Sequence, residues 1–117
     1  MKFKLIIVMA QDGLTDQAIE TARANGATGC TVITSARGEG LNPTHTFLGL
    51  TFSGQRDLLL FLVEEHNSRK IMEAIGQVCM FETKPGTGVA IQLDIEVAIG
   101  LAGQIASIKE EISKEDL

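Results

Sequence analysis

The chain has 117 residues, of which 44% are hydrophobic, and its formal net charge is −5, from ten Lys and Arg against fifteen Asp and Glu. This length and hydrophobic share are typical of one globular domain and exclude a disordered chain. The acidic balance provides no basic surface for a phosphate backbone, and Trp and Tyr are absent, so we expect no nucleic-acid partner.

The first third of the chain predicts a strand, a helix and a second strand. Apolar residues alternate over 2–9, which predicts a strand rather than a signal peptide, because the apolar run is short and no small-residue cleavage site follows it. Helical spacing extends over 14–25 and is closed by Asn25 and Gly26. β-branched residues then predict a strand over 28–36.

A long loop over 37–55 leads to the next strand. It holds Gly38 and Gly40 near its start and the apolar patch FLGLTF near its end. Alternating apolar residues over 48–52 indicate a hairpin that extends the sheet. In that case only about 41–47 would be mobile.

The second half repeats the order of strand, helix and strand. The continuous apolar run 57–64 predicts a strand with two apolar faces, and HNS at 66–68 supplies cap candidates for the helix that follows. The segment 82–88 breaks the chain before a clear alternation that predicts a strand over 89–97. The apolar spacing of 103–117 predicts a terminal helix.

This order of elements, two βαβ-like halves joined by a loop, predicts a ferredoxin-like α+β fold with a C-terminal helix. In that fold two helices cover one face of a four-stranded sheet. The other face would leave apolar side chains of the 57–64 strand in contact with water, so we expect subunits to associate through it. The fold hosts many functions and decides none of them.

No window of the sequence approaches the roughly 18 apolar residues of a membrane span, so we expect a protein that is not embedded in a membrane. Cys30 and Cys79 are too few for a disulfide scaffold, which favours the reducing cytoplasm.

Two segments carry a resemblance to a known family. The stretch 26-GATGCTVITSARGEG-40 covers the second strand and its glycine exit, and 84-KPGTGVAIQLDIEVAIGL-101 covers a second glycine turn and the last strand. Together they resemble the nitrogen regulatory PII signalling family, in a divergent branch, over nearly the whole chain. The resemblance implies one PII-like domain over 1–117, a cytoplasmic homotrimer, and no catalysis.

The resemblance also implies a site and a signalling loop. Adenine nucleotides would bind in clefts between subunits, bounded by a T-loop at 37–55 and a B-loop at 82–88. The T-loop would change shape with ligand and control a transporter or an enzyme, and its docking residues would be Phe47, Leu48 and Leu50. The ligand-binding set would be Arg37, Gly38, Gly40, Lys84, Gly86, Thr87 and Gly88.

Elementary chemistry agrees with part of this set. Glycines allow backbone N–H groups to approach an anion closely, and Arg37 and Lys84 could meet a phosphate. From the residues alone, ordinary turns explain the same glycines at least as well, and Thr87 could serve only its own turn.

The chain departs from the family pattern mainly where cations are usual. Val89 stands in place of a lysine, Gly100 and Ala102 in place of two arginines, Leu41 in place of another arginine, and Asn42 in place of a glutamine. We therefore expect ATP with magnesium and 2-oxoglutarate to bind weakly, and AMP, ADP or a cyclic nucleotide to suit the site better. The chain has no tyrosine, so the tyrosine modification of nitrogen-regulating members cannot occur.

Two alternatives stay open at this point. One is a metal-handling trimer like the CutA proteins, which share the fold, but His45, His66, Cys30 and Cys79 show no paired ligand spacing. The other is a purely structural trimer without nucleotide binding. An enzyme is not expected, because no nucleophile is placed beside a base and the acidic pair at 64–65 would point to opposite faces of a strand end.

Overall fold

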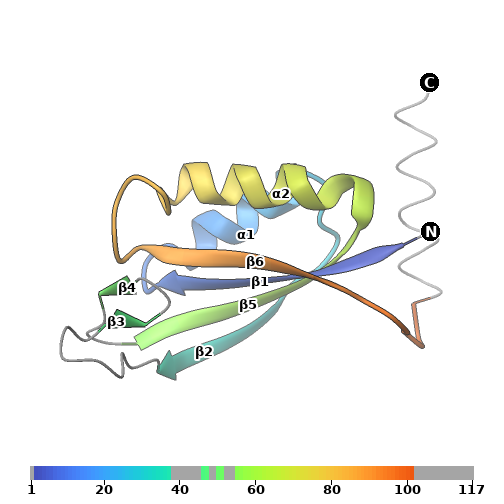
Figure 1. Ribbon diagram of the computed structural model, residues 1–117, viewed down its shortest axis with the longest axis horizontal. Coiled ribbons are helices and arrows are strands. Elements are labelled where there is room, and N and C mark those ends of the chain that lie inside the picture. Colours follow the sequence, from blue (N-terminus) through green and yellow to red (C-terminus); the bar gives the residue numbers. More distant parts are fainter. Residues whose placement is uncertain (1, 38–45, 48–49, 52–54, 102–117) are drawn as a thin grey trace.

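The computed structural model describes residues 2–37, 46–47, 50–51 and 55–101. Its elements in chain order are β1 (Phe3–Gln11), α1 (Thr15–Ala24), β2 (Thr31–Arg37), β3 (Thr46–Phe47), β4 (Leu50–Thr51), β5 (Gln55–Glu64), α2 (Glu65–Val78) and β6 (Gly88–Asp94). The main sheet has the order β2-β5-β1-β6, with all neighbours antiparallel. Figure 1 shows both helices on the same face of this sheet. The predicted ferredoxin-like α+β fold is therefore confirmed.

The core lies between the sheet and the two helices. β1 and β5 pair along their whole length, with Ile6 opposite Phe61 at the centre. These two side chains are 0% and 1% exposed, and Ile71 and Ile75 of α2 belong to the same buried cluster. Burying each such side chain contributes about 1.5–3 kcal/mol, so the β1–β5 pair and α2 form the centre of the fold.

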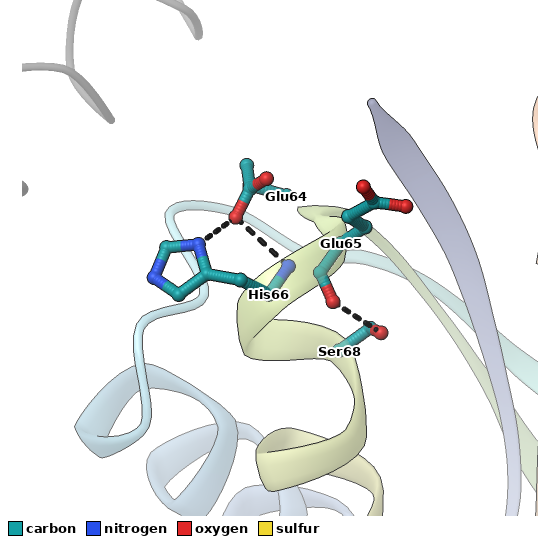
Figure 2. Close-up of polar contacts among 4 residues, drawn as sticks. All are labelled: Glu64, Glu65, His66 and Ser68. Carbon is teal, nitrogen blue, oxygen red and sulfur yellow. Dashed lines mark hydrogen bonds and ion pairs between the residues drawn. The ribbon is translucent and has the colours of Figure 1, made fainter. Parts of the chain in front are cut away.

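The start of α2 differs from the prediction that 66–68 would cap it. Glu64 is the cap, because its carboxylate accepts a hydrogen bond from the His66 backbone N–H at 2.9 Å and also contacts Nδ1 of the same residue (Figure 2). Ser68 instead lies inside the first turn, where its hydroxyl donates to the Glu65 carbonyl oxygen at 2.9 Å. A carboxylate is a favourable acceptor at a helix N-terminus, so the helix begins directly after β5.

The strand predicted over 89–97 ends earlier than its alternation suggests. The last pair between β1 and β6 joins Lys4 to Asp94, and the Lys4 ammonium also contacts the Asp94 carboxylate. β1 begins at Phe3, only one residue before Lys4, so residues 96 and 97 extend past the end of that strand. Val97 and Ile99 are 79% and 96% exposed. The alternation alone overestimated the strand because a strand also needs a partner.

The predicted hairpin is present inside the long loop, but it does not extend the main sheet. β3 and β4 pair with each other, Thr46 with Thr51 and Phe47 with Leu50, as a separate two-stranded sheet. The predicted extension is therefore wrong for the part of the loop that the structure describes. The terminal helix predicted over 103–117 lies outside the described residues.

The sheet face opposite the helices is apolar, as the sequence predicts. Strand pairing places Ile91, Ile7 and Leu60 in one row across three strands of this face. Ile91 is 44% exposed. The neighbouring positions of the same face are also apolar: Leu5, Met9, Leu58, Leu62, Val89 and Leu93. Such a continuous apolar face on one chain favours association with another surface.

Candidate functional site

Four strand ends meet where the long loop leaves the sheet (Figure 1). Arg37, the last residue of β2, pairs with Gln55, the first residue of β5, and Gly88 at the start of β6 pairs with Ala10 near the end of β1. Arg37 and Gly88 thus lie at the same end of the sheet on its two edge strands, which are three strand spacings, or about 14 Å, apart across the sheet. The fold therefore brings the two loops of the predicted site to one end of the molecule.

The turn before β6 is held together from inside by Thr87. Its hydroxyl lies 2.9 Å from the Lys84 carbonyl oxygen and 3.1 Å from the Met80 carbonyl oxygen, and its side chain is buried. The carbonyl oxygen of Thr87 accepts a hydrogen bond from the Gln11 backbone N–H at 2.8 Å. The hydroxyl of Thr87 therefore serves the turn, and its carbonyl oxygen holds the turn against the end of β1.

Gly86 and Gly88 of this turn are favoured over other residues for different structural reasons. Gly86 has a φ of +88°, in the left-handed region that glycine adopts without steric cost. Gly88 has no space for a side chain, because an added Cβ would lie 2.4 Å from the Met9 carbonyl oxygen and 2.5 Å from the Phe81 ring. Lys84, in contrast, is exposed, so its ammonium can meet an anion without losing a buried partner.

Asp57 has a role at this end of the sheet that the sequence analysis did not find. Its carboxylate accepts a hydrogen bond from the Thr15 hydroxyl at 2.5 Å and a longer one from the Ser35 backbone N–H at 3.4 Å. Ser35 lies in a bulge of β2 with a φ of +60°, a conformation that residues other than glycine seldom adopt. Asp57 therefore connects α1 to the strand that leads into the long loop.

We expect Asp57→Ala to lower the free energy of unfolding by about 1.5–3 kcal/mol, because the charged acceptor of these hydrogen bonds is removed. Thr15→Val should cost about 1 kcal/mol, and the double variant should cost less than the sum, since both changes remove the same bond. Urea unfolding of the four proteins measures this cycle. Additive costs would show that the Thr15–Asp57 contact contributes nothing.

Arg56 is a second residue that the sequence analysis did not single out. Its side chain is 5% exposed, and it pairs with Gln11 on one side and Ala36 on the other. A buried guanidinium therefore lies at the end of the sheet where the long loop leaves it. From the sequence it resembles an ordinary solvated charge before an apolar strand, and only strand pairing places it between two neighbours.

The other chemical groups that the sequence offers are dispersed. Among the described residues, no group of three or more His, Cys, Asp or Glu side chains is arranged to hold a metal ion, and His45 lies outside them. Burial raises the pKa of the Cys30 and Cys79 thiols, which keeps both protonated at neutral pH, whereas a cysteine ligand must lose its proton. His66 contacts Glu64 at the opposite end of β5 from the long loop.

Three of the predicted site residues, Gly38, Gly40 and Leu48, lie outside the described residues. The two remaining docking candidates, Phe47 and Leu50, are partners in the small β3–β4 ladder. In the part of the chain that the structure describes, no helix is long and apolar enough to cross a membrane.

Solved structures share this fold at low sequence identity. A PII-like signalling protein from Thermus thermophilus is 22% identical, with a TM-score of 0.61 over 81% of this chain and 87% of its own. CPII from Thiomonas intermedia is 20% identical, with a TM-score of 0.64 over 85% and 91%. GlnK from B. subtilis is 14% identical, with a TM-score of 0.68 over 86% and 87%.

Sequence comparison gives the more specific result. A search among curated proteins finds no significant match. The pattern of one family, Nitrogen regulatory protein P-II, matches residues 3–101 and so covers every strand and helix of the described fold. The chain belongs to the nitrogen regulatory protein P-II family.

Proposed function

We propose that this protein is a non-catalytic regulatory homotrimer that binds an adenine nucleotide in clefts between subunits and signals through the 37–55 loop. One observation carries the proposal: the exit of the long loop at Arg37 and the Gly86–Gly88 turn lie at the same end of one sheet. Family membership supports a regulatory role. The B. subtilis GlnK structure is a complex with ATP, and CPII structures contain ADP and AMP.

The proposed ligand contacts are the cations Arg37 and Lys84 and the backbone N–H groups of Gly38, Gly40, Gly86, Thr87 and Gly88. The exposed ammonium of Lys84 supplies positive charge, and the closely packed turn supplies donors at fixed positions. Val89 and the exposed Gly100 provide no further cation. A nucleotide with one or two phosphates therefore suits this site better than ATP with magnesium.

The trimer and the partner follow from separate features. The continuous apolar face around Ile91, Ile7 and Leu60 would become the contact between subunits, so that each cleft has walls from two chains. The loop would then project from the assembly and present Phe47, Leu48 and Leu50 to a cytoplasmic enzyme or to the cytoplasmic side of a transporter. Loss of water from such apolar anchors is the usual source of affinity in a docking contact.

Calorimetry with AMP, ADP, ATP and cyclic AMP tests the proposed site. We expect ADP or AMP to bind, to raise the melting temperature by mass action, and to bind at least tenfold more weakly to the Lys84→Ala variant. Lys70→Ala, which removes an exposed lysine from α2, is the matched control and should bind normally. A response to copper or zinc with no response to any nucleotide would instead favour a metal-handling trimer.

A further inference from the structure

We propose that a groove beside α2 binds a small molecule that has an apolar body and a positive charge. The groove, called the α2 groove below, lies between the C-terminal half of α2, the turn over 79–87 and the start of β6. Figure 1 shows this turn leading from the end of α2 to the start of β6. Its volume is about 670 Å³, within the roughly 300–1,000 Å³ of small-molecule sites.

Gly76 keeps the α2 groove open at a cost to the helix. It lies inside α2, where glycine is the least favourable residue apart from proline. An added Cβ would meet nothing within 4 Å, and the backbone has no positive φ that would demand glycine. Neither packing nor backbone conformation therefore requires a glycine here. The glycine leaves open space at the floor of the groove, and a larger side chain would fill this space.

At the end of α2, a second residue that lines the groove stands at a position where its side chain is disfavoured by the backbone conformation. The N–H of Phe81 donates to the Gly76 carbonyl oxygen at 2.9 Å, and the N–H of Met80 donates to the Gln77 carbonyl oxygen at 3.2 Å. This pair of bonds is the Schellman motif, whose left-handed position is usually glycine. Here that position is Met80, with a φ of +58° and a side chain 45% exposed. An apolar side chain therefore lines the groove at a position where the backbone conformation favours glycine.

The walls are mainly apolar, and their charges are negative. Met72, Met80 and Phe81 supply flexible and aromatic surface, which adapts to flat or irregular apolar molecules. Among the described residues that line the groove, the charged ones are Glu73 and Glu82, both carboxylates. Glu73 lies 3.5 Å from Arg69 on the exposed helix surface, a contact that water screens readily. The side chains that line the groove therefore favour a cation over an anion, whereas Lys84, which is outside this lining, belongs to the proposed phosphate contacts.

The α2 groove shares Gly86 and Gly88 with the proposed nucleotide contacts but differs from them in charge and in its α2 wall. Phe81 connects the groove to the turn, because its ring packs directly against Gly88. A ligand that touches Phe81 therefore changes the surroundings of the Gly88 backbone N–H. The amide signal of Gly88 therefore reports binding in the groove when no nucleotide is present.

Tryptamine and indole-3-acetate test the inference, because they share an indole ring and carry opposite charges. In a titration of ¹⁵N-labelled protein without nucleotide, we expect tryptamine to shift the amide signals of Phe81 and Gly88 and to bind at least tenfold more tightly than indole-3-acetate. The double variant Glu73→Gln with Glu82→Gln should remove this preference. Equal binding of the two probes, or no binding of either, would overturn the inference.

Gly76 provides matched variants for the same titration. Gly76→Leu should fill the groove and weaken tryptamine at least tenfold, while Gly76→Ala should leave most of the volume and retain binding. Both should fold, since an added Cβ meets no atom, and Gly76→Ala should raise the melting temperature by about 4 °C through its better helix propensity. If a folded Gly76→Leu protein bound tryptamine with unchanged affinity, the probe would bind outside the α2 groove and the inference would be overturned.

Discussion

Replacing Gly88 by alanine should lower the free energy of unfolding by about 3 kcal/mol, or about 10 °C in melting temperature. The new Cβ would lie 2.4 Å from the Met9 carbonyl oxygen and 2.5 Å from the Phe81 ring. The Phe81 ring could move, but the Met9 oxygen belongs to the backbone of β1 and cannot shift without disturbing the pairing with β6. The cost therefore comes from forced displacement of a strand.

Gly29→Ala is the matched control for this prediction. An alanine at this position would meet no atom within 4 Å, and its φ is outside the positive range. We expect its unfolding free energy to stay within about 0.5 kcal/mol of the original value, as for ordinary surface changes. Thermal and urea unfolding of both variants give the comparison. If the two alanine variants lost equal stability, close packing around Gly88 could not be the cause.

The sequence predicted the fold well because each element carries its own periodicity. The apolar runs that hold Ile6 and Phe61 have strand length, and the spacing of Ile71 and Ile75 is helical, so local pattern alone indicates the order of elements. Boundaries were less predictable because they depend on partners. The end of β6 at Asp94 is decided by where β1 begins, at the opposite end of the chain.

The candidate site was predictable only where a motif is local. The Gly86–Gly88 turn was found from its glycines, and the structure then gave Gly88 a packing cause that no single sequence reveals. Asp57 was missed because its role depends on Thr15 and Ser35, which are 42 and 22 positions away. Gly76 did leave a signal, a glycine inside a helical stripe, but the groove that explains it forms only when α2 packs beside β6.

The largest change in assembly should follow from Ile91→Glu. Ile91 is 44% exposed in the single chain, so a carboxylate is tolerated there while the subunit is alone. In the proposed trimer the same position would be buried beside Ile7, and an unpaired buried carboxylate is strongly disfavoured. We expect the original protein to have three times the 12.5 kDa mass of one chain and the variant to have the mass of one chain.

Light scattering after size exclusion measures both masses, and Gln92→Glu is the control. Gln92 is the next residue of β6, exposed, and pairs with Ile6 on the helix side of the sheet, so its charge should leave the trimer intact. Nucleotide binding should be lost together with the trimer in the Ile91 variant, because each proposed cleft needs two subunits. A trimer that survives Ile91→Glu would mean that subunits meet elsewhere, and a monomeric original protein would leave no cleft between subunits for the nucleotide.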